Sequence, residues 1–317
     1  MRRPHGSRDG FAALNLAMRL TVIVTFLNEA AFMPRLLASV EGQTRRPDRL
    51  VLVDDGSSDG SGELAAEFAA RHDFAVALQR PPRRREADRL ARAAELEAFQ
   101  WAVGMLDDPF DVVAKMDADL DLNPTHFARM LMEMEADPQL GLAGAVLSDV
   151  APDGTTARKP APTNHVRGAT KFYRRECFDQ IQPIPPQLGW DMVDELKSRH
   201  AGWRTESFEL DGGDTLHLRP TGTHDGALRA YRRWGECAWG YGAHPAFMLL
   251  GAVKRMTWRP HVIGGALYAF GYLSAAARRV PRVDRELRAF VRREEARQVL
   301  DQARAVIPRR ELAASRR

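Results

Sequence analysis

The stretch Val112–Asp119, with the sequence VVAKMDAD, carries the strongest indication of both fold and chemistry. Apart from Lys115, its first five residues are apolar and begin with two β-branched side chains, which predicts a buried strand. Two carboxylates one residue apart, Asp117 and Asp119, follow at the end of this strand. Carboxylate oxygens are the ligands that Mg²⁺ and Mn²⁺ prefer, and such sites keep coordination positions open for substrate phosphates. The alternative is a solvated loop in which aspartates simply end a strand.

Apolar runs typical of strands and apolar periodicities typical of helices alternate on both sides of this stretch. Strands are expected at residues 20–27, 50–53, 74–78, 110–116, 141–147 and 168–174, and helices at 31–40, 61–71, 90–105, 125–135, around Glu176 and at 190–200. The Pro-, Thr- and Gly-rich segment 151–163 is expected to be a loop, and 204–218 to be extended. This alternation predicts an α/β/α sandwich with a mostly parallel central sheet and crossover helices.

Acidic segments follow three of the expected strands. Asn28-Glu29, Asp54-Asp55 and Asp117-Ala118-Asp119 each come directly after an apolar run. In a parallel sheet the carboxyl ends of the strands share one edge, and ligands bind in the crevice outside that edge. The three segments are therefore expected to meet around one crevice.

The composition is that of a globular protein with a modest positive charge. Of the 317 residues 44% are hydrophobic, which is enough for a buried core, and the formal net charge is +4. Arginines concentrate in residues 83–92 and again after Arg229. No zinc-finger or RNA-binding motif accompanies them, which argues against a nucleic-acid partner. An anionic membrane surface or a phosphorylated substrate fits this charge better.

Cysteine usage and the amino terminus indicate an intracellular chain. Cys177 and Cys237 lie far apart and fit no metal-binding or redox spacing, so two reduced thiols are expected. Residues 1–18 lack the sustained apolar segment of a signal peptide and are predicted to be a disordered extension. The sequence therefore predicts a cytoplasmic protein.

Five segments, in this order, resemble glycosyltransferase family 2, whose members are inverting enzymes of the GT-A fold. They are Thr21–Glu29 (TVIVTFLNE), Val53–Ser61 (VDDGSSDGS), Val113–Asp119 (VAKMDAD), Gly168–Arg175 (GATKFYRR) and Gly189–Glu195 (GWDMVDE). The resemblance spans residues 20–223. It implies a GT-A glycosyltransferase domain over 19–225, followed by a C-terminal helical region over 226–317.

The resemblance also implies a nucleotide-sugar donor at the acidic crevice. Residues expected to contact the donor are Thr25, Asn28, Glu29, Asp54, Asp55, Lys115, Asp117 and Arg219. Thr25 departs from the family, which usually has proline there. Either Asp54 or Asp55 is assigned to the nucleobase and Glu29 to the ribose region, although D-D-G-S is also typical of a β-turn. Lys115 either contacts phosphate or extends from its strand to solvent.

A Mg²⁺ or Mn²⁺ ion is the cofactor that the resemblance implies, with Asp117, Asp119 and His217 as its ligands. Asp119 is assigned as the direct ligand, whereas Asp117 alternatively approaches the ribose or a metal-bound water. His217 is assigned by resemblance alone, since a single histidine is often structural. Arg219 is assigned to the diphosphate on the same basis.

Inverting transfer needs one general base that takes the proton of the acceptor hydroxyl. Where the family commonly shows adjacent Glu-Asp, this chain has Asp191 followed by Asp194-Glu195. Asp191 is the preferred base and Asp194 the second candidate. The expected helix N-terminus keeps Asp191 ionised, and the alternative role of this residue is to cap that helix.

Two apolar stretches in the C-terminal region, Trp239–Val253 and Val262–Ala277, are too short to cross a bilayer comfortably, since about 20 apolar residues are needed. Arginines flank the second stretch, and Trp258, Tyr268 and Tyr272 are side chains that suit a membrane interface. These stretches are predicted to lie in the inner leaflet. The alternative is that they pack on the catalytic domain.

Taken together, these features predict a metal-dependent inverting transfer of a sugar from a nucleotide sugar to a hydroxyl of a lipid-linked or growing glycan, as in bacterial polysaccharide assembly. The enzyme is expected at the cytoplasmic face of the inner membrane, as a peripheral protein. One alternative is transfer to a polyprenyl phosphate. Another, from a different class, is a non-catalytic protein that binds sugar nucleotides.

Overall fold

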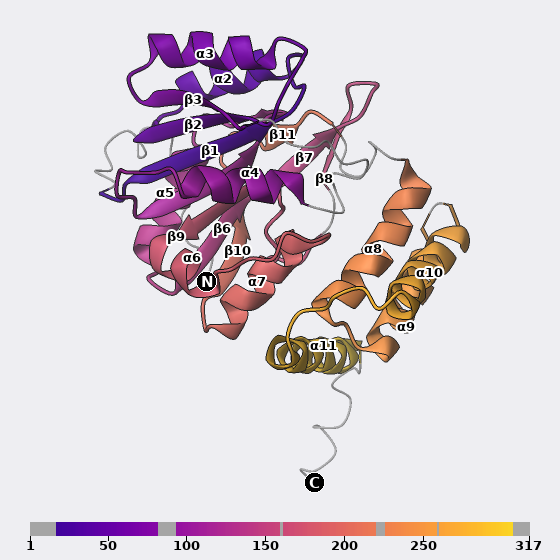
Figure 1. Cartoon of the computed structure of the whole chain (residues 1–317). Coiled ribbons are helices and arrows are strands. Elements are labelled where there is room, and N and C mark those ends of the chain that lie inside the picture. Colours follow the sequence, from indigo (N-terminus) through magenta and orange to yellow (C-terminus); the bar gives the residue numbers. More distant parts are fainter. Residues whose placement is uncertain (1–16, 82–92, 159–160, 220–225, 259, 307–317) are drawn as a thin grey trace. The chain divides into compact units, whose positions relative to one another are not determined.

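A computed structural model describes residues 17–81, 93–158, 161–219, 226–258 and 260–306 (Figure 1). The chain divides into two compact units, residues 1–224 and 225–317. Each unit is described by itself. The extension predicted over 1–18 lies almost wholly outside the described residues.

A seven-stranded sheet forms the centre of the first unit. In spatial order its strands are β10 (Arg204–Phe208), β6 (Leu140–Ala145), β9 (Thr170–Arg174), β4 (Val112–Asp117), β1 (Leu20–Phe26), β2 (Arg49–Asp54) and β3 (Ala75–Gln79). All run parallel except β9, which is antiparallel to both of its neighbours. The predicted mostly parallel sheet is confirmed, and the described strands begin and end within a few residues of the expected positions.

Helices cover both faces of this sheet. One face carries α2 (Met33–Glu41), α3 (Ser61–Arg71) and α5 (His126–Ala136), and the other carries α4 (Ala94–Val103), α6 (Arg175–Ile181) and α7 (Trp190–His200). Figure 1 shows α4 lying across its face. Successive residues of a strand point to opposite faces, so Val22 and Val24 pack in one core and Ile23 packs in the other. This arrangement confirms the predicted α/β/α sandwich. Residues 90–92 of the helix predicted at 90–105 lie outside the described residues.

A second, smaller sheet lies beyond the end of β4. Its strands, in spatial order, are β5 (Leu120–Asp121), β11 (Thr215–His217), β7 (Leu147–Val150) and β8 (Thr156–Arg158). The expectation of an all-loop segment at 151–163 is therefore wrong. Every residue of β8 is exposed, so no apolar alternation marked it, and only its pairing with β7 makes it a strand. The extended chain expected over 204–218 is divided between β10 and β11.

The second unit is helical, with α8 (Ala227–Tyr241), α9 (Pro245–Met256), α10 (Ile263–Ala277) and α11 (Arg285–Val306). The stretch 239–253, expected as one apolar segment, is divided between α8 and α9. Gly242, with φ of 90°, ends α8, and Pro245 begins α9. A Cβ on Gly235 would lie 1.9 Å from the Tyr268 carbonyl oxygen, so the close contact of α8 and α10 requires glycine. Within the described ranges, no helix combines the length and the apolar character that crossing a membrane demands.

Candidate active site

The carboxyl ends of β1, β2 and β4 lie next to one another, as predicted. Thr25 in β1 is in register with Val53 of β2 on one side and with Asp117 of β4 on the other. Asp54 ends β2 and is in register with Phe26. The parallel register thus brings the three acidic segments to one edge of the sheet.

Hydrogen bonds join the loop after β1 to the loop after β2. Asn28 has a left-handed backbone with φ of 56°, which asparagine tolerates better than most residues. Its side-chain oxygen accepts from the Ser58 amide at 2.8 Å, and the Glu29 amide donates to Ser61 Oγ at 2.8 Å. Asn28 therefore holds the loop that carries Glu29 rather than extending away from it.

Asp54 and Asp55 are both buried but have different partners. Asp54 Oδ1 accepts from the amides of Gly56 (3.0 Å) and Ser57 (2.7 Å), the hydrogen bonds of a turn. A Cβ on Gly62 would lie 2.8 Å from Asp54 Oδ2, so the second oxygen faces the first turn of α3. Asp55 instead pairs with Arg80 at 2.7 Å. Asp54 Oδ1 is thus engaged in the turn, and Asp55 is engaged with Arg80.

Three potential metal ligands converge beyond the end of β4. A ligand atom from each of Asp117, Asp119 and His217 lies within 4.8 Å of the other two. Oxygen and nitrogen ligands of this kind suit Mn²⁺ or Mg²⁺. His217 reaches Asp119 because β11 pairs with β5, which places His217 opposite Leu120. Nothing in the local sequence around residue 217 indicated this pairing.

The charges around Asp119 keep its carboxylate ionised. Asp119 Oδ2 accepts from Arg219 Nε at 2.9 Å, and Oδ1 lies 3.4 Å from His217 Nε2. Burial alone would raise the pKa of Asp119, but His217 and Arg219 outweigh burial and lower it. Burial alone would lower the pKa of His217, and Asp119 and Asp149 instead raise it to about 9.

Asp149 and Arg167 belong to this group and were missed by the sequence analysis. Asp149 Oδ1 lies 3.2 Å from His217 Nδ1 and accepts from Arg167 Nη2 at 2.6 Å. Strand β7 pairs with β11 and holds Asp149 beside His217. The available signal was the position of Asp149 two residues after the apolar run 141–147, close to the pattern that marked the other strand ends.

Two buried oxygens at this edge lack a hydrogen-bond partner among the described residues, Thr25 Oγ1 and Glu29 Oε2. The other oxygen of Glu29 accepts from Arg219 Nη2. Burial raises the pKa of Glu29, although Arg219 opposes this effect. A buried polar atom without a partner is costly, and a ligand hydroxyl or N–H group at this edge would relieve that cost.

Lys115 does not extend to solvent, which was one of its two expected roles. Its side chain is fully buried, and Nζ donates to Asp117 Oδ1 (2.5 Å), Gly168 O (2.9 Å) and Glu95 Oε2 (3.2 Å). These three oxygens enclose the ammonium group. Lys115 instead fixes the position of Asp117.

The two candidate bases differ in accessibility. Asp191 lies in the first turn of α7, is half-buried, and its carboxylate has no hydrogen bond or ion pair within the described part of the chain. A Cβ on Gly168 would lie 3.2 Å from Asp191 Oδ2, which places this carboxylate against the segment that holds Lys115. Asp194 is fully buried, and Lys171 and Tyr173 occupy its two oxygens at 2.7 and 2.5 Å. Asp194 is therefore not placed to accept a proton from a substrate.

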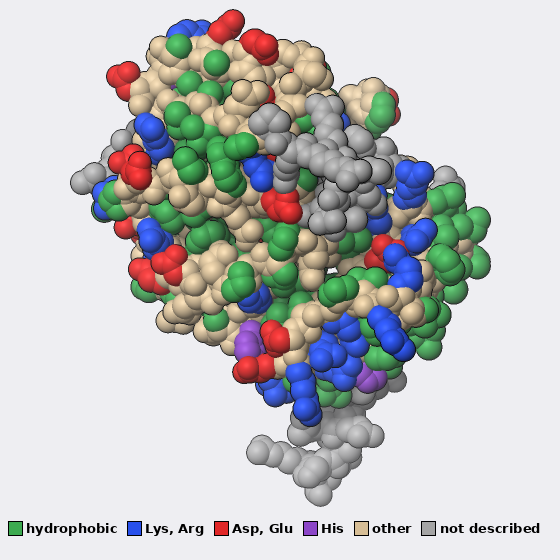
Figure 2. Space-filling view, in the orientation of Figure 1, with side chains coloured by type: hydrophobic (Ala, Val, Ile, Leu, Met, Phe, Trp, Pro, Cys, Tyr) green, Lys and Arg blue, Asp and Glu red, His purple; other side chains and the backbone are tan. Residues whose placement is uncertain are grey.

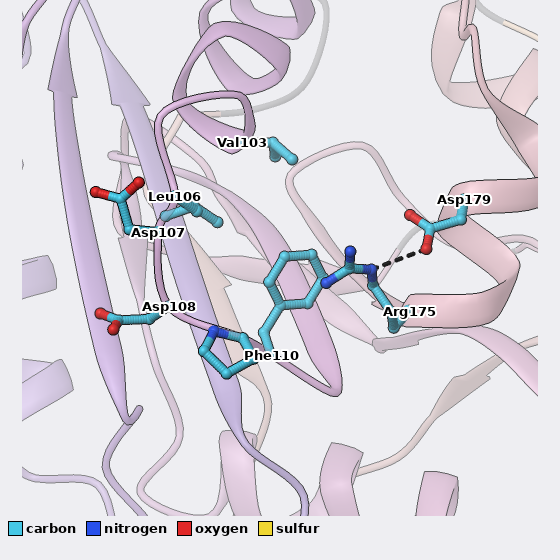
Figure 3. Close-up of a pocket in the computed structure, with 8 residues that line it drawn as sticks. Val103, Leu106, Asp107, Asp108, Phe110, Arg175 and Asp179 are labelled. Atoms are coloured by element: carbon cyan, nitrogen blue, oxygen red, sulfur yellow. Dashed lines mark hydrogen bonds and ion pairs between the residues drawn. The ribbon is translucent and has the colours of Figure 1, made fainter.

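A cavity of about 310 Å³ lies away from these residues (Figure 3). Phe110, two residues before β4, and Arg175, directly after β9, line it, and Arg175 stacks on the Phe110 ring at 4.5 Å. The cavity thus lies at the amino end of β4, whereas the metal ligands lie at its carboxyl end. None of the predicted site residues lines this cavity.

Residues 21–184, about half of the chain, match the family description "Glycosyl transferase family 2". The chain belongs to glycosyltransferase family 2. The family expected from the five sequence segments is therefore confirmed. The match covers both aspartates of residues 117–119 but ends before Asp191 and His217.

Two curated relatives and one solved structure extend this comparison. A polyprenol monophosphomannose synthase from Mycolicibacterium smegmatis is 31% identical over 162 residues, which is 50% of this chain and 55% of the relative. An undecaprenyl-phosphate 4-deoxy-4-formamido-L-arabinose transferase from Pectobacterium carotovorum is 34% identical over 118 residues, 35% of this chain and 32% of the relative. The chain thus spans between a third and just over half of the length of these relatives.

A mannosyltransferase from Pyrobaculum calidifontis, solved with GDP-Man and Mn²⁺, superimposes with a TM-score of 0.53 at 18% identity. The superposition covers 91% of this chain and 80% of that one. At this identity the likeness shows the fold alone, and it agrees with the GT-A-type sandwich predicted from the sequence.

Proposed function

We propose that this chain transfers a sugar from a nucleotide-sugar donor to a lipid-linked acceptor, with inversion at the sugar and with a divalent metal ion. The observation that carries the proposal is the convergence of Asp117, Asp119 and His217 within 4.8 Å at the carboxyl ends of the strands. The residues present fit Mn²⁺ or Mg²⁺, which would be held by Asp119 and His217 with Asp117 beside them. When bound, the ion supplies positive charge that stabilises the departing nucleoside diphosphate.

The donor nucleoside is proposed to bind at the ends of β1 and β2. Glu29 Oε2 accepts a ribose hydroxyl, and Thr25 Oγ1 contacts the nucleoside beside it, because both atoms are buried without partners in the described residues. Asp54 or Asp55 is the proposed contact to the nucleobase, because Asp54 ends β2 and Asp55 follows it at this edge of the sheet. Arg219 is proposed to contact the diphosphate, because its guanidinium lies between Glu29 and Asp119.

Asp191 is the proposed general base. It takes the proton of the acceptor hydroxyl while that oxygen attacks the anomeric carbon, and the bond to the diphosphate breaks on the opposite side. The support is the unengaged carboxylate of Asp191 against Gly168, next to the loop that positions Asp117. Gly189 is the N-cap of α7 and no described side chain caps this helix, so Asp191 acts on the helix N-terminus only through its charge.

A second candidate reaction is transfer to a polyprenyl phosphate. The names of the polyprenol and undecaprenyl-phosphate relatives favour it. A phosphate acceptor is already anionic and needs no base. Either acceptor is a membrane lipid, so we propose that the chain acts as a peripheral protein at the cytoplasmic face of the inner membrane, with residues 19–225 catalytic and 226–317 in contact with lipid.

Calorimetry with UDP, GDP and dTDP, each with and without Mn²⁺, tests the donor site. One nucleotide is expected to bind at least tenfold more tightly with Mn²⁺. Binding that is indifferent to Mn²⁺ contradicts the metal site, and binding without turnover of any donor supports a non-catalytic protein.

The Asp191→Asn variant separates the two acceptors. With a hydroxyl acceptor, kcat is expected to fall by about 10²–10⁴-fold, while donor affinity stays unchanged. With a polyprenyl phosphate acceptor, kcat is expected to be spared. An unchanged kcat with hydroxyl acceptors removes Asp191 as the base. Asp179→Asn, an exposed aspartate on α6, is the matched control.

A further inference from the structure

The helical unit concentrates the exposed apolar side chains of this protein. Among the described residues, fourteen large hydrophobic side chains are strongly exposed, and all but Met105 lie at or after Leu228. Figure 2 shows hydrophobic side chains gathered along the edge formed by α9 and α10. Scattered exposed hydrophobic residues are normal, but a contiguous patch marks an interaction surface.

Helical spacing aligns these side chains on α9 and α10. The exposed positions of α10 include 263, 266, 270, 273 and 277, at intervals of three and four residues, and all are apolar. On α9 the exposed apolar positions include 246, 249, 250 and 253. The largest of these side chains are Leu249, Leu250, Val253, Ile263, Phe270 and Leu273, each between 51% and 59% exposed, and they define the α9–α10 face.

The opposite side of α10 is already covered. Tyr268 and Tyr272 are buried in the core of the second unit, and Gly264 and Gly271 pack closely against α8. The α9–α10 face therefore points away from the core that holds these helices together.

The segment that contains this face is rich in positive charge, although Glu236 in α8 pairs with Arg278 at 2.7 Å. From Cys237 to Val283 the sequence contains no Asp or Glu but six cationic residues: Lys254, Arg255, Arg259, Arg278, Arg279 and Arg282. Arg255 lies within 6 Å of the Trp258 and Tyr268 rings, at 5.5 and 4.2 Å. Trp258 is itself exposed, as expected of an aromatic residue at a membrane interface.

We infer that the α9–α10 face docks onto an anionic lipid surface, with both helices lying in the plane of the interface. A 15-residue helix such as α10 is about 22 Å long, short of the roughly 30 Å hydrocarbon core, so the face enters one leaflet only. A second copy of the chain is the competing occupant. In a two-fold dimer the same cationic surfaces would meet and repel, whereas anionic headgroups neutralise them.

The α9–α10 face refines the membrane contact of the proposed function. It rests on that function in one respect, because a lipid-linked acceptor is the reason for a membrane contact. The test is co-sedimentation of the full chain with two kinds of vesicle, one of phosphatidylcholine alone and one that also contains about 30% phosphatidylglycerol, an anionic lipid. The chain is expected to bind the anionic vesicles, and raised salt is expected to weaken binding.

Two pairs of variants identify the surface. Phe270→Asp with Leu273→Asp is expected to reduce vesicle binding by at least tenfold, whereas Met105→Asp, equally exposed in the first unit, changes nothing. Lys254→Gln with Arg279→Gln is expected to reduce binding to anionic vesicles by roughly 25-fold, since each cation near such a surface contributes about fivefold. Arg46→Gln with Arg71→Gln is the control, because both lie exposed in the first unit.

Three results overturn the inference: no binding to anionic vesicles, equal binding by the Phe270/Leu273 variant, or a dimer in light scattering that this variant dissociates. Nucleotide binding with Mn²⁺, measured on the same samples, reports the folding of the first unit. If a variant loses vesicle binding but still binds nucleotide, the change affects the α9–α10 face alone. If the unaltered chain fails to bind nucleotide, the proposed function is contradicted instead.

Discussion

Two groups of acidic side chains in the first unit hold their negative charge in different ways. Asp194 and Glu195 surround the ammonium group of Lys171, at 2.7 and 3.5 Å, and all three side chains are buried. Asp117 and Asp119 instead converge with His217 at the sheet edge, where Asp117 is partly exposed. The first group is wholly enclosed with its cation, whereas the second presents ligand atoms near the surface although Asp117 also pairs with buried Lys115.

The difference teaches how a carboxylate acquires a structural or a chemical role. Burial alone would lower the pKa of Lys171. The negative charges of Asp194 and Glu195 outweigh burial and raise this pKa, so the lysine stays charged. A buried ion pair of this kind is costly to break and offers nothing to a substrate. Asp119 is paired as well, but through Arg219, which is partly exposed.

The largest expected effect comes from removing the internal cation. Lys171→Met leaves Asp194 without its cation, and the free energy of unfolding is expected to fall by about 3–5 kcal/mol in urea titrations. The double variant Lys171→Met/Asp194→Asn is expected to recover part of this loss. Lys254→Met, an exposed control, is expected to change stability by less than about 0.5 kcal/mol. A loss below about 1 kcal/mol for Lys171→Met would contradict the role of this cluster.

At the other cluster the expected effect is on binding rather than folding. Asp119→Asn keeps the shape of the side chain but removes a charged ligand, so the Kd for Mn²⁺ is expected to rise by about 100-fold or more, as measured by calorimetry. Asp121→Asn, two residues along and paired with Arg35, is the matched control. Equal Mn²⁺ affinity in the Asp119 and Asp121 variants would place the metal elsewhere.

A smaller effect is expected from Asp149, which touches His217 and is not itself among the convergent ligands. A carboxylate at Nδ1 fixes the ring and leaves Nε2 directed at the ion, so Asp149→Ala is expected to weaken Mn²⁺ binding by about 10–100-fold. Asp149→Asn retains an acceptor oxygen and is expected to restore most of the affinity. The same loss in both variants would indicate that the charge of Asp149, rather than its hydrogen bond, matters.

Glu295 in α11 provides a third case, a buried carboxylate with neither a lysine nor a metal site. Burial raises the pKa of Glu295 to about 7, although the His244 amide and Arg292 act in the opposite direction. The unfolded carboxyl loses its proton near pH 4.5 and the folded one near 7, so the folded state holds the proton more tightly. The free energy of unfolding is therefore expected to fall as pH rises through this window.

Glu295→Gln is expected to remove this fall and to be more stable than the unaltered chain by about 1–2 kcal/mol at pH 8, with little difference at pH 4.5. Urea unfolding of the second unit, followed by tryptophan fluorescence, measures it. Parallel pH profiles for the two proteins would show that Glu295 is not the group responsible.

Prediction from sequence succeeded where a signal was local. The apolar run 112–116 and the two aspartates after it gave both β4 and two of the three convergent ligands. The expectation that Lys115 extends to solvent failed, because the sequence does not show whether a strand that carries a lysine lies at the centre or at the edge of a sheet. Strand β4 lies between β1 and β9, and acidic side chains from distant segments enclose the amine.

The order of strands and helices, the sandwich and the acidic strand ends were determined by the sequence itself, because alternation of apolar residues and the chemistry of side chains are local properties. Only the tertiary structure decided which acidic side chains lie together and which are buried. Asp191 and Asp194 lie one helical turn apart, yet Lys171 of β9 pairs with the carboxylate of Asp194 and donates only to the backbone carbonyl of Asp191. Likewise, the pairing of β11 with β5 and β7 is what brings His217 to Asp119 and Asp149, from about 100 and 70 residues away along the chain.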